Sequence, residues 1–484
     1  MGAGLGPGAW RLRLVALLGV VLIAAALLIV DRPFILDMDD AYITAVNARA
    51  LLAGVDPNYG APALAGATSL FDLAGVALLS LVMSPPAACA LFGVLGAIAY
   101  LQAVVSLAAS YRLTGGQVAI LLLLAGFTGF VALQLFNGLE TAWGLAAATA
   151  LIVLARRKSP TRWLAALAGL APFIRPELAV LAALLGARQA WLRWRSGRAR
   201  ALPAISLDLA VALAAAAPWL AWQWFETGQF VVTTAAAKEA FYAGSAGTFL
   251  QRLPRLVALL PVVLGPAVLL VPFARRTSLA LALWMFGAVF LAIYWLWFPI
   301  EFTGYSFRHD YTLLPVCLWA VCETAEAGGR AARLVIIAAL AWTVPSAAAS
   351  AKAFGDGLAI CRDSLALAAW ADRALPPGAP VMVLDAGAIA WGSHLKLVDM
   401  VGLKTPSSVA SQKRWTLASG GRLRGRALAE IARRQGVRYV VAFRGPGYAM
   451  NVPQALSAEG YRLSLVRPSP RKRFGYDLFS LAPP

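Results

Sequence analysis

Residues 14–30 read LVALLGVVLIAAALLIV, a run without charged side chains. A helix needs roughly 20 mainly apolar residues to cross the hydrocarbon core of a bilayer, so this run predicts a membrane-spanning helix. Arg11 and Arg13 precede it, as basic residues precede the apolar core of a signal peptide. No small-x-small cleavage site directly precedes Asp31, and many further apolar runs follow. We therefore expect an uncleaved first helix with its N-terminus in the cytoplasm.

The composition extends this interpretation to the whole chain. Of 484 residues, 60% are hydrophobic and 13% are charged, with a mean hydropathy of +0.72. A soluble chain of this length needs more charge to keep its surface hydrated. The net charge of +19 would suggest nucleic-acid binding in a soluble protein. Here the basic residues cluster between apolar runs, as the positive-inside rule predicts, so no nucleic-acid partner is expected.

These basic clusters predict the topology of a multi-pass protein in a bacterial inner (plasma) membrane. Apolar runs between them give about eleven helices. The sidedness of the flanking segments requires an odd number of membrane crossings before Asn137 but leaves the number within residues 67–136 open. The segments expected in the cytoplasm are 11–13, 156–158, 188–200, 275–276 and 330–333. The spans expected between them are 139–155, 163–174 with 178–187, 206–224, 255–273, 278–298, 311–325 and 332–350, with outer loops at 226–253 and 299–310.

The chain changes character after residue 351. Charged residues occur throughout 352–484, no run of 18 apolar residues remains, and Pro376-Pro377-Gly378 signals a turn. Residues 381–384 and 437–442 have the pattern of buried strands, and 426–435 has helical spacing. We predict a transmembrane domain over 1–351, with a periplasmic loop at 31–66, and a small periplasmic α/β domain over 352–484.

The acidic stretch Asp37-Met38-Asp39-Asp40 follows the first span. Apolar residues over 41–53 recur at helical spacing, which predicts an amphipathic helix at the membrane surface with its apolar face in lipid and Asp40, Thr44 and Asn47 on the other face. Carboxylates this close repel, so one should have a raised pKa, or the group should bind a cation. Either suits a general base. The alternative is that Asp39 or Asp40 caps the helix.

This stretch resembles a family pattern. Asp39-Asp40-Ala41-Tyr42-Ile43-Thr44, Asn47-Ala48-Arg49 and Leu52-Ala53-Gly54 resemble the opening of GT-C glycosyltransferases, in particular the branch of mycobacterial arabinofuranosyltransferases and polyprenyl-phosphate-mannose-dependent mannosyltransferases. Members of that branch carry a catalytic Asp in the first periplasmic loop and use a polyprenyl-phosphate sugar as donor. The resemblance therefore implies that Asp39 or Asp40 is the catalytic base.

Further short stretches resemble the same branch in the same order. They are 66–71, 137–142, 175–177, 234–238, 306–311 and 385–391 with 398–403. In Arg175-Pro176-Glu177, the proline should break a helix and the two charges should pair, because unpaired charges in an apolar stretch are costly. A structural Arg–Glu pair and a phosphate-binding role for Arg175 both remain open. Asp385 is either part of a structural turn or an acceptor-glycan ligand.

The resemblance implies a set of binding residues. Arg175, Lys238 and Arg308 are expected to bind the donor phosphate, since cations stabilise a charged leaving group. Lys238 as a solvated loop residue is the alternative, as is helix-dipole compensation for Glu140. Substrate contacts are expected from Asn47, Arg49, Glu140, Glu177 and Tyr311. No cofactor is certain, and a divalent cation (Mg²⁺ or Mn²⁺) on Asp39, Asp40 and Glu140 is left open.

These observations predict an inverting glycosyltransferase. It would move arabinofuranose or a mannose-like sugar from a polyprenyl-phosphate donor to a cell-envelope glycan or glycolipid in the periplasm, with membrane lipid around it. The first alternative is a lipid-linked glycan transporter or flippase, which should show inverted-repeat symmetry between its halves. The second is a non-catalytic scaffold that presents the C-terminal domain. The four scattered cysteines predict neither a disulfide framework nor a zinc site.

Overall fold

The computed structural model describes residues 13–21, 24, 34–157, 161–230, 234–244, 249–297, 307–327, 329–444, 451–471 and 474–484. The chain divides into two compact units. Unit 1 comprises Met1–Arg32, Ala90–Ala221 and Phe249–Ala353, and unit 2 comprises Pro33–Cys89, Trp222–Thr248 and Phe354–Pro484. Residues 13–21 of the predicted first span are helical, and most of the remainder of that span lies outside the described residues.

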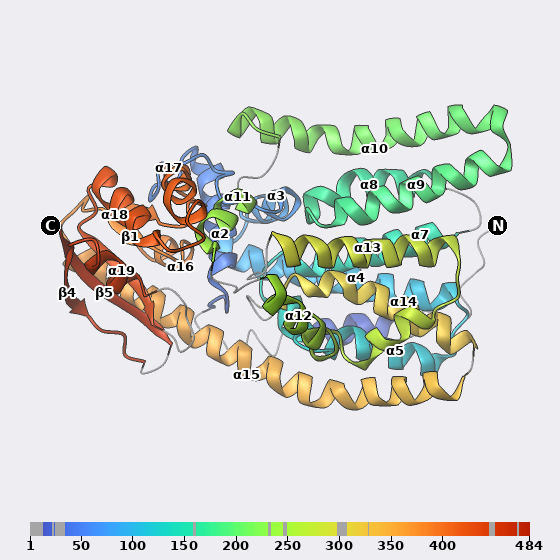
Figure 1. Ribbon diagram of the computed structural model, residues 1–484. Coiled ribbons are helices and arrows are strands. Elements are labelled where there is room, and N and C mark those ends of the chain that lie inside the picture. The colour runs from blue at the N-terminus through green and yellow to red at the C-terminus, as the bar shows by residue number, and fades with distance from the viewer. Residues whose placement is uncertain are drawn as a thin grey trace. The chain divides into compact units, whose positions relative to one another are not determined.

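Unit 1 is built from helices. In chain order they are α4 (Pro85–Ser110), α5 (Gly115–Phe127), α6 (Val131–Phe136), α7 (Thr141–Arg156), α8 (Arg162–Ile174), α9 (Leu178–Ser196), α10 (Arg198–Thr227), α12 (Phe249–Leu264), the 3₁₀ helix η1 (Pro266–Phe273), α13 (Ser278–Leu296), the 3₁₀ helix η3 (Asp310–Leu313), α14 (Leu314–Ala327) and α15 (Arg330–Ala374). Helices α7, α8, α9 and α13 pack side by side (Figure 1).

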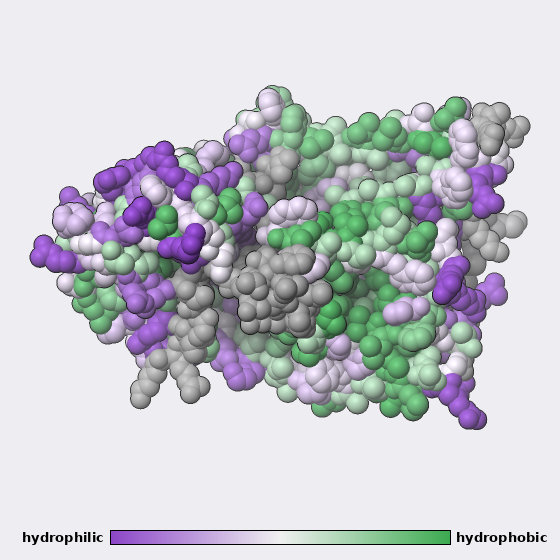
Figure 2. All heavy atoms as spheres, in the orientation of Figure 1, coloured by the Kyte–Doolittle hydropathy of each residue, from purple (hydrophilic) through white to green (hydrophobic). Residues whose placement is uncertain are grey.

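The helices of unit 1 are those of a membrane protein. Among the described residues, four helices are long and apolar enough to cross a bilayer, namely Pro85–Ser110, Ala201–Thr227, Ser278–Leu296 and Arg330–Ala374. Large apolar side chains are exposed on all four of them, for example Leu95, Leu213, Leu281 and Ile337. Figure 2 shows mainly hydrophobic surface over α10 and α13. Exposed apolar surface of this extent is stable against lipid and unfavourable against water.

Most predicted spans coincide with helices, but one predicted span and one predicted loop differ. The run 255–273 is not one helix, because α12 ends at Leu264 and η1 begins at Pro266. Gly265 between them has a φ of 67°, a conformation that glycine adopts without steric cost. The predicted outer loop at 226–253 is also not simply a loop, because α11 (Thr234–Tyr242) forms within it and α12 begins at Phe249. The predicted total of about eleven crossings stays a prediction.

Unit 2 combines short helices with a small sheet. Its helices are α2 (Asp39–Ala53), α3 (Leu70–Leu79), α11, α16 (Ala388–Trp391), α17 (Pro406–Ser411), the π-helical turn η4 (Gln412–Leu417), α18 (Arg424–Gln435) and α19 (Val452–Ser457). Its strands are β1 (Val381–Val383), β2 (Leu397–Asp399), β3 (Tyr439–Arg444), β4 (Arg462–Arg467) and β5 (Gly475–Ala482). The predicted strands at 381–384 and 437–442 are therefore confirmed as β1 and β3.

The sheet has the order β2-β1-β3-β5-β4. Strand β1 runs parallel to β2 and β3, whereas β5 pairs antiparallel with β3 and β4. Successive side chains of a strand point to opposite faces. Accordingly, Met382 belongs to one apolar core, and Val381 and Val383 belong to a second core. Ile43 of α2 joins the first core and Val46 joins the second.

The packing of α2 corrects one prediction. The sequence predicted a surface helix with its apolar face in lipid, but eight of its residues are buried within the protein and its apolar side chains enter both cores beside the sheet. The helix-cap alternative is corrected in part. Met38, and neither aspartate, occupies the N-cap position, but Asp39 and Asp40 both lie in the first turn, where the helix dipole favours carboxylates.

Helix α15 runs without interruption from Arg330 to Ala374. The sequence placed the end of the transmembrane domain at residue 351, inside this helix. The two compact units divide within the same helix, between Ala353 and Phe354. The helical backbone therefore continues through the predicted domain boundary, and that boundary stays a prediction.

Candidate functional site

In unit 1, the turn between α6 and α7 positions Glu140. Asn137 accepts a hydrogen bond from the backbone N–H of Leu139 at 3.0 Å and donates its side-chain amide to Gln134 at 2.8 Å. Gly138, with a φ of 73°, lets the chain turn where other residues would be strained. Glu140 then occupies the N-cap position of α7 with 5% of its surface exposed. A carboxylate at this position is stabilised by the helix dipole.

The break between α8 and α9 positions Arg175. A residue before proline favours extended backbone, and Arg175 has a φ of −149° and a ψ of 129°, so α8 ends at Ile174. The Arg175 side chain passes close to Gly144 of α7, where an added Cβ would lie 2.4 Å from Cδ of Arg175. The predicted interruption of this apolar stretch by Pro176 is confirmed.

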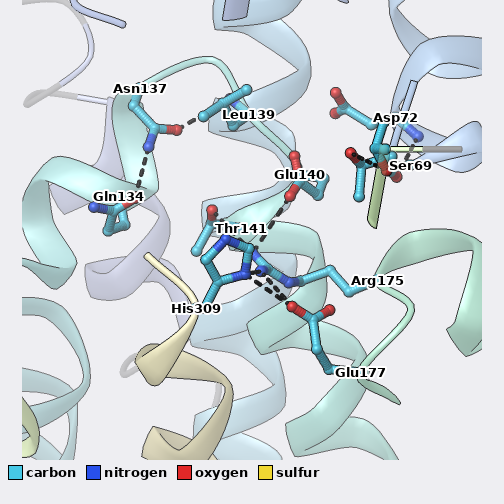
Figure 3. Close-up of polar contacts among 12 residues, drawn as sticks. Ser69, Asp72, Gln134, Asn137, Leu139, Glu140, Thr141, Arg175, Glu177 and His309 are labelled. Carbon is cyan, nitrogen blue, oxygen red and sulfur yellow. Dashed lines mark hydrogen bonds and ion pairs between the residues drawn. The ribbon is translucent and has the colours of Figure 1, made fainter. Parts of the chain in front are cut away.

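Arg175 lies between two glutamates, as Figure 3 shows. Its Nη2 is 3.0 Å from Oε1 of Glu177, and its Nη1 is 3.4 Å from Oε1 of Glu140. Nη1 also lies 3.4 Å from the hydroxyl of Thr141. The predicted Arg175–Glu177 pair is therefore confirmed. The sequence did not indicate that Glu140, 35 positions earlier, would join it, because no local pattern relates the two segments.

His309 completes this cluster. Its Nδ1 lies 2.8 Å from Nη2 of Arg175 and 2.9 Å from Oε1 of Glu177. Tyr294 of α13 donates its hydroxyl to the same Oε1 at 2.6 Å. Arg308 is 4% exposed and interacts electrostatically with both Glu140 and Arg175. Two arginines are thus buried in one cluster, which we call the arginine cluster: Glu140, Arg175, Glu177, Arg308 and His309.

Replacement of Gly144 by alanine should disturb the arginine cluster. The new Cβ would overlap the middle of the Arg175 side chain, whose guanidinium group the two glutamates hold in place. Overpacking of this kind typically costs about 1–3 kcal/mol, so we expect a lower melting temperature of the purified protein. Gly186→Ala on α9 is the matched control, because no atom lies within 4 Å of its added Cβ. Equal melting temperatures of the two variants would contradict this role of Gly144.

In unit 2, Asp39 attaches α2 to the start of α16. Its Oδ2 accepts a hydrogen bond from the backbone N–H of Gly387 at 2.9 Å, and its Oδ1 accepts one from Ala388 at 2.7 Å. The backbone of α2 approaches so closely that a Cβ at Gly387 would lie 2.1 Å from the carbonyl oxygen of Asp39. Asp385, two residues before Gly387, accepts a hydrogen bond from Tyr476. Two segments about 350 residues apart therefore form one acidic cluster.

The predicted pKa perturbation occurs at Asp39, with a different cause. The pKa of Asp39 lies well above the usual range of an aspartate. Burial is the largest cause, and the negative charge of Asp385 is the next largest. Asp40, its sequence neighbour, contributes least among these causes. Burial also raises the pKa of Asp385 to about 6. The repulsion between adjacent carboxylates that the sequence suggested is therefore secondary to burial and to an acid from the C-terminal segment.

These raised pKa values predict a pH-dependent stability. Because folding raises the pKa of Asp385 from its unfolded value near 3.9 to about 6, its favourable contribution is complete below about pH 4 and is lost as the pH rises through about 6. We expect the wild-type protein to melt at a higher temperature at pH 5 than at pH 7.5. Asp385→Asn should reduce this difference by about 2–6 °C. An unchanged difference in the variant would contradict the assignment.

A buried lysine holds the loop after α2. Lys404 and Asp56 have no exposed side-chain surface, and Nζ of Lys404 lies 2.7 Å from Oδ2 of Asp56. Lys404 also donates a hydrogen bond to the side-chain oxygen of Asn47. Oδ1 of Asp56 accepts from the backbone N–H groups of Asn58 and Tyr59 at 3.0 Å and 3.1 Å. Sequence reasoning missed Lys404, because nothing near position 404 signals a partner at position 56.

These contacts change the expected roles of two residues. Asn47, predicted to contact substrate, is 1% exposed and hydrogen-bonded to Lys404. Arg49 donates to the side-chain oxygen of Asn58 at 2.8 Å and to the carbonyl of Ala390 at 3.1 Å, and its guanidinium lies 5.1 Å from the ring centre of Trp391. Both side chains therefore hold α2 and its loop against other parts of unit 2.

The remaining predicted residues are placed as follows. Tyr311 is fully buried, and its hydroxyl accepts a hydrogen bond from the backbone N–H of Phe130, which favours a structural role over substrate contact. Lys238 lies on α11 and is partly buried, so it is not a solvated loop residue. Ser306 of the resembling stretch 306–311 lies outside the described residues, as do residues 299–306 of the predicted outer loop. Among the described residues, no three His, Cys, Asp or Glu side chains form a metal-ligand group.

Comparison with known proteins gives the fold. A model of a domain of unknown function, DUF8728, matches residues 358–478. No curated protein matches the chain. The structure of ArnT from Cupriavidus metallidurans bound to undecaprenyl phosphate is similar, with a TM-score of 0.53 and 14% identity over 98% of each chain. ArnT in the apo state gives a TM-score of 0.54 and 13% identity over 96% of this chain and 97% of that one.

A third similar structure is arabinofuranosyltransferase AftD from Mycobacteria, with a TM-score of 0.46 and 17% identity over 97% of this chain and 40% of that chain. These proteins are GT-C glycosyltransferases. The similarity to ArnT over nearly the whole of both chains shows that this protein has the fold of a GT-C glycosyltransferase, as the sequence resemblance implied. It is accordingly a polytopic helical membrane protein with a small C-terminal sheet.

Proposed function

We propose that the protein is an inverting glycosyltransferase that takes a sugar from a polyprenyl-phosphate donor and transfers it to a cell-envelope glycan or glycolipid. The arginine cluster is the observation that carries this proposal. The fold supports it, since ArnT shares the fold and has been solved with undecaprenyl phosphate bound. Arabinofuranose and mannose are the leading sugars, because the sequence around Asp39 and Asp40 resembles enzymes that transfer them.

The arginine cluster has the chemistry of a phosphate site. Arg175 is 2% exposed and Arg308 is 4% exposed, and two buried like charges are unfavourable unless anions accompany them. Glu140 and Glu177 provide this compensation without a ligand. A guanidinium group presents several N–H donors in a fixed plane that matches phosphate oxygens. We assign Arg175 and Arg308 to the donor phosphate, with Glu140 and Glu177 as the groups that hold Arg175, and Lys238 as a further cation for the phosphate.

We assign the catalytic base to Asp40 and a positioning role to Asp39. Both carboxylate oxygens of Asp39 accept backbone hydrogen bonds from the start of α16, which fixes the first turn of α2 and therefore the direction of Asp40. In the reaction, the Asp40 carboxylate takes the proton of an acceptor hydroxyl, and the hydroxyl oxygen attacks the anomeric carbon. The bond from that carbon to the phosphate oxygen breaks, leaving polyprenyl phosphate and a sugar of inverted configuration.

The orientation follows from the basic segments of the sequence. The positive-inside rule places the N-terminus and the basic segments in the cytoplasm of a bacterium, so Asp40 and residues 352–484 face the periplasm. The isoprenoid chain of the donor lies in the bilayer beside the exposed apolar helices of unit 1. The C-terminal sheet and its helices bind the acceptor glycan.

A panel of donors tests this function. Purified protein in liposomes is incubated with polyprenyl-phosphate arabinofuranose, mannose, glucose and galactose, together with an envelope glycan acceptor. We expect one donor to be consumed with transfer of its sugar. Consumption of none of these donors, with the protein folded, would contradict the proposed donor class. Movement of intact donor across the bilayer would instead indicate a transporter.

A further inference from the structure

The Nδ1 atom of His309 has two incompatible neighbours. Nη2 of Arg175 lies 2.8 Å away and Oε1 of Glu177 lies 2.9 Å away. A guanidinium group only donates hydrogen bonds, and an ionised carboxylate only accepts them. A single ring nitrogen either carries a proton or offers a lone pair, so it satisfies one of these neighbours at a time. Whether Nδ1 carries a proton therefore selects its partner.

The two states differ in what they do to Arg175. In neutral His309 with its proton on Nε2, Nδ1 accepts a hydrogen bond from Arg175 and occupies one of its donors. In protonated His309, Nδ1–H donates to Glu177, which already accepts a hydrogen bond from Tyr294. Arg175 then keeps Glu140 and Glu177 but loses the His309 partner of Nη2, and it gains a neighbouring positive charge. Protonation thus frees one N–H donor of Arg175 for an external anion.

The charges around His309 make this exchange electrostatically consistent. Arg175 and Arg308 are balanced by Glu140 and Glu177. Asp310, beside His309, is fully buried, and neither of its carboxyl oxygens has a hydrogen-bond partner among the described residues. Burial without a partner favours the neutral form of such an acid. The cluster is then close to neutral, so an arriving phosphate adds an uncompensated negative charge unless the protein gains a proton.

We propose that His309 is a proton-linked latch on the phosphate site: its protonation frees one Nη2 donor of Arg175 for the lipid phosphate and supplies the compensating positive charge. The inference rests on the proposed function, because it takes the arginine cluster as the phosphate site. Protonation of His309 and phosphate binding favour each other, since each stabilises the state that the other requires. Histidine is suited to this role because it changes charge between about pH 5 and 8.

Binding of a phosphate whose own charge does not change with pH tests this latch. The probe is farnesyl methyl phosphate, a diester with one fixed negative charge, and its dissociation constant is measured from pH 5.5 to 8.5 on the full-length protein in nanodiscs. For the wild type we expect binding to weaken by up to about tenfold per pH unit above pH 7. His309→Gln should bind with little pH dependence. His394→Gln is the matched control, because His394 is exposed and forms an ion pair with Asp372 in unit 2, outside the arginine cluster.

The outcomes separate the latch from the function on which it rests. Equal pH dependence in the wild type and His309→Gln would overturn the latch alone, because the site would still bind phosphate. Absence of binding at every pH would overturn the phosphate site and the latch with it. A direct readout is available because the chain has only two histidines. In ¹⁵N-histidine-labelled His394→Gln protein at pH 7.5, the probe should increase the doubly protonated imidazole signal, and an unchanged spectrum at saturation would contradict the latch.

Discussion

Asp40→Asn is expected to lower the rate of sugar transfer by about 10²–10⁴-fold, the usual contribution of a general base. Asparagine keeps the size of the side chain but cannot accept the proton of the acceptor hydroxyl. Helix α2 is held by contacts of other side chains, including Ile43 and Val46 in the two cores, so the variant should fold and melt like the wild type. The measurement is kcat for transfer, with the melting temperature recorded on the same preparation.

Asp39→Asn provides the comparison for Asp40→Asn. The amide loses one of the two hydrogen bonds from Gly387 and Ala388, because only one of its two polar atoms is an acceptor. We expect a lower melting temperature and a smaller loss of kcat than in Asp40→Asn. Full transfer by Asp40→Asn, or complete inactivation confined to a normally stable Asp39→Asn, would contradict the assigned roles.

Lys404→Met is expected to destabilise unit 2 by about 3–5 kcal/mol, the cost of leaving one partner of a buried ion pair uncompensated. Asp56 has no exposed side-chain surface, so water cannot replace the lost ammonium group. The loop that follows α2 should detach first, because Lys404 also holds Asn47. The melting temperature and the rate of proteolysis within residues 54–69 measure the effect.

Two further variants complete this test. Lys396→Met changes an exposed lysine in the same C-terminal segment and should leave the melting temperature unchanged. The double variant Lys404→Met with Asp56→Asn removes both charges and should recover part of the lost stability, since it leaves no unpaired buried charge. If Lys404→Met melts like Lys396→Met, the buried ion pair does not hold the loop.

The sequence predicted the features that local patterns determine. Uncharged runs identified most helices, Pro176 marked the break between α8 and α9, and the spacing of Arg175 and Glu177 across it indicated their pair. Alternating and continuous apolar stretches located β1 and β3. In each case the residues responsible lie within one or two turns of each other, so periodicity and helix-breaking residues suffice.

The contacts between segments far apart in the sequence could not be predicted in this way. His309 joins Arg175 across 134 positions, and Lys404 reaches Asn47 across 357 positions. Helical spacing assigned the apolar face of α2 to lipid, because spacing within α2 carries no information about the C-terminal segment that covers it. Tertiary packing determined what these side chains contact, and it reversed this conclusion. The substrate roles of Asn47 and Arg49, which the family resemblance implied, stay predictions.

Phosphorus-31 NMR of the proteoliposome reaction tests the proposed function most directly. The donor is a phosphodiester and the product, polyprenyl phosphate, is a monoester, so transfer converts one signal into the other. For the preferred donor, we predict that the monoester appears at the rate at which sugar enters the acceptor, and that Asp40→Asn reduces both rates together. A phosphodiester signal that stays constant while labelled sugar crosses the bilayer would contradict sugar transfer and identify a transporter.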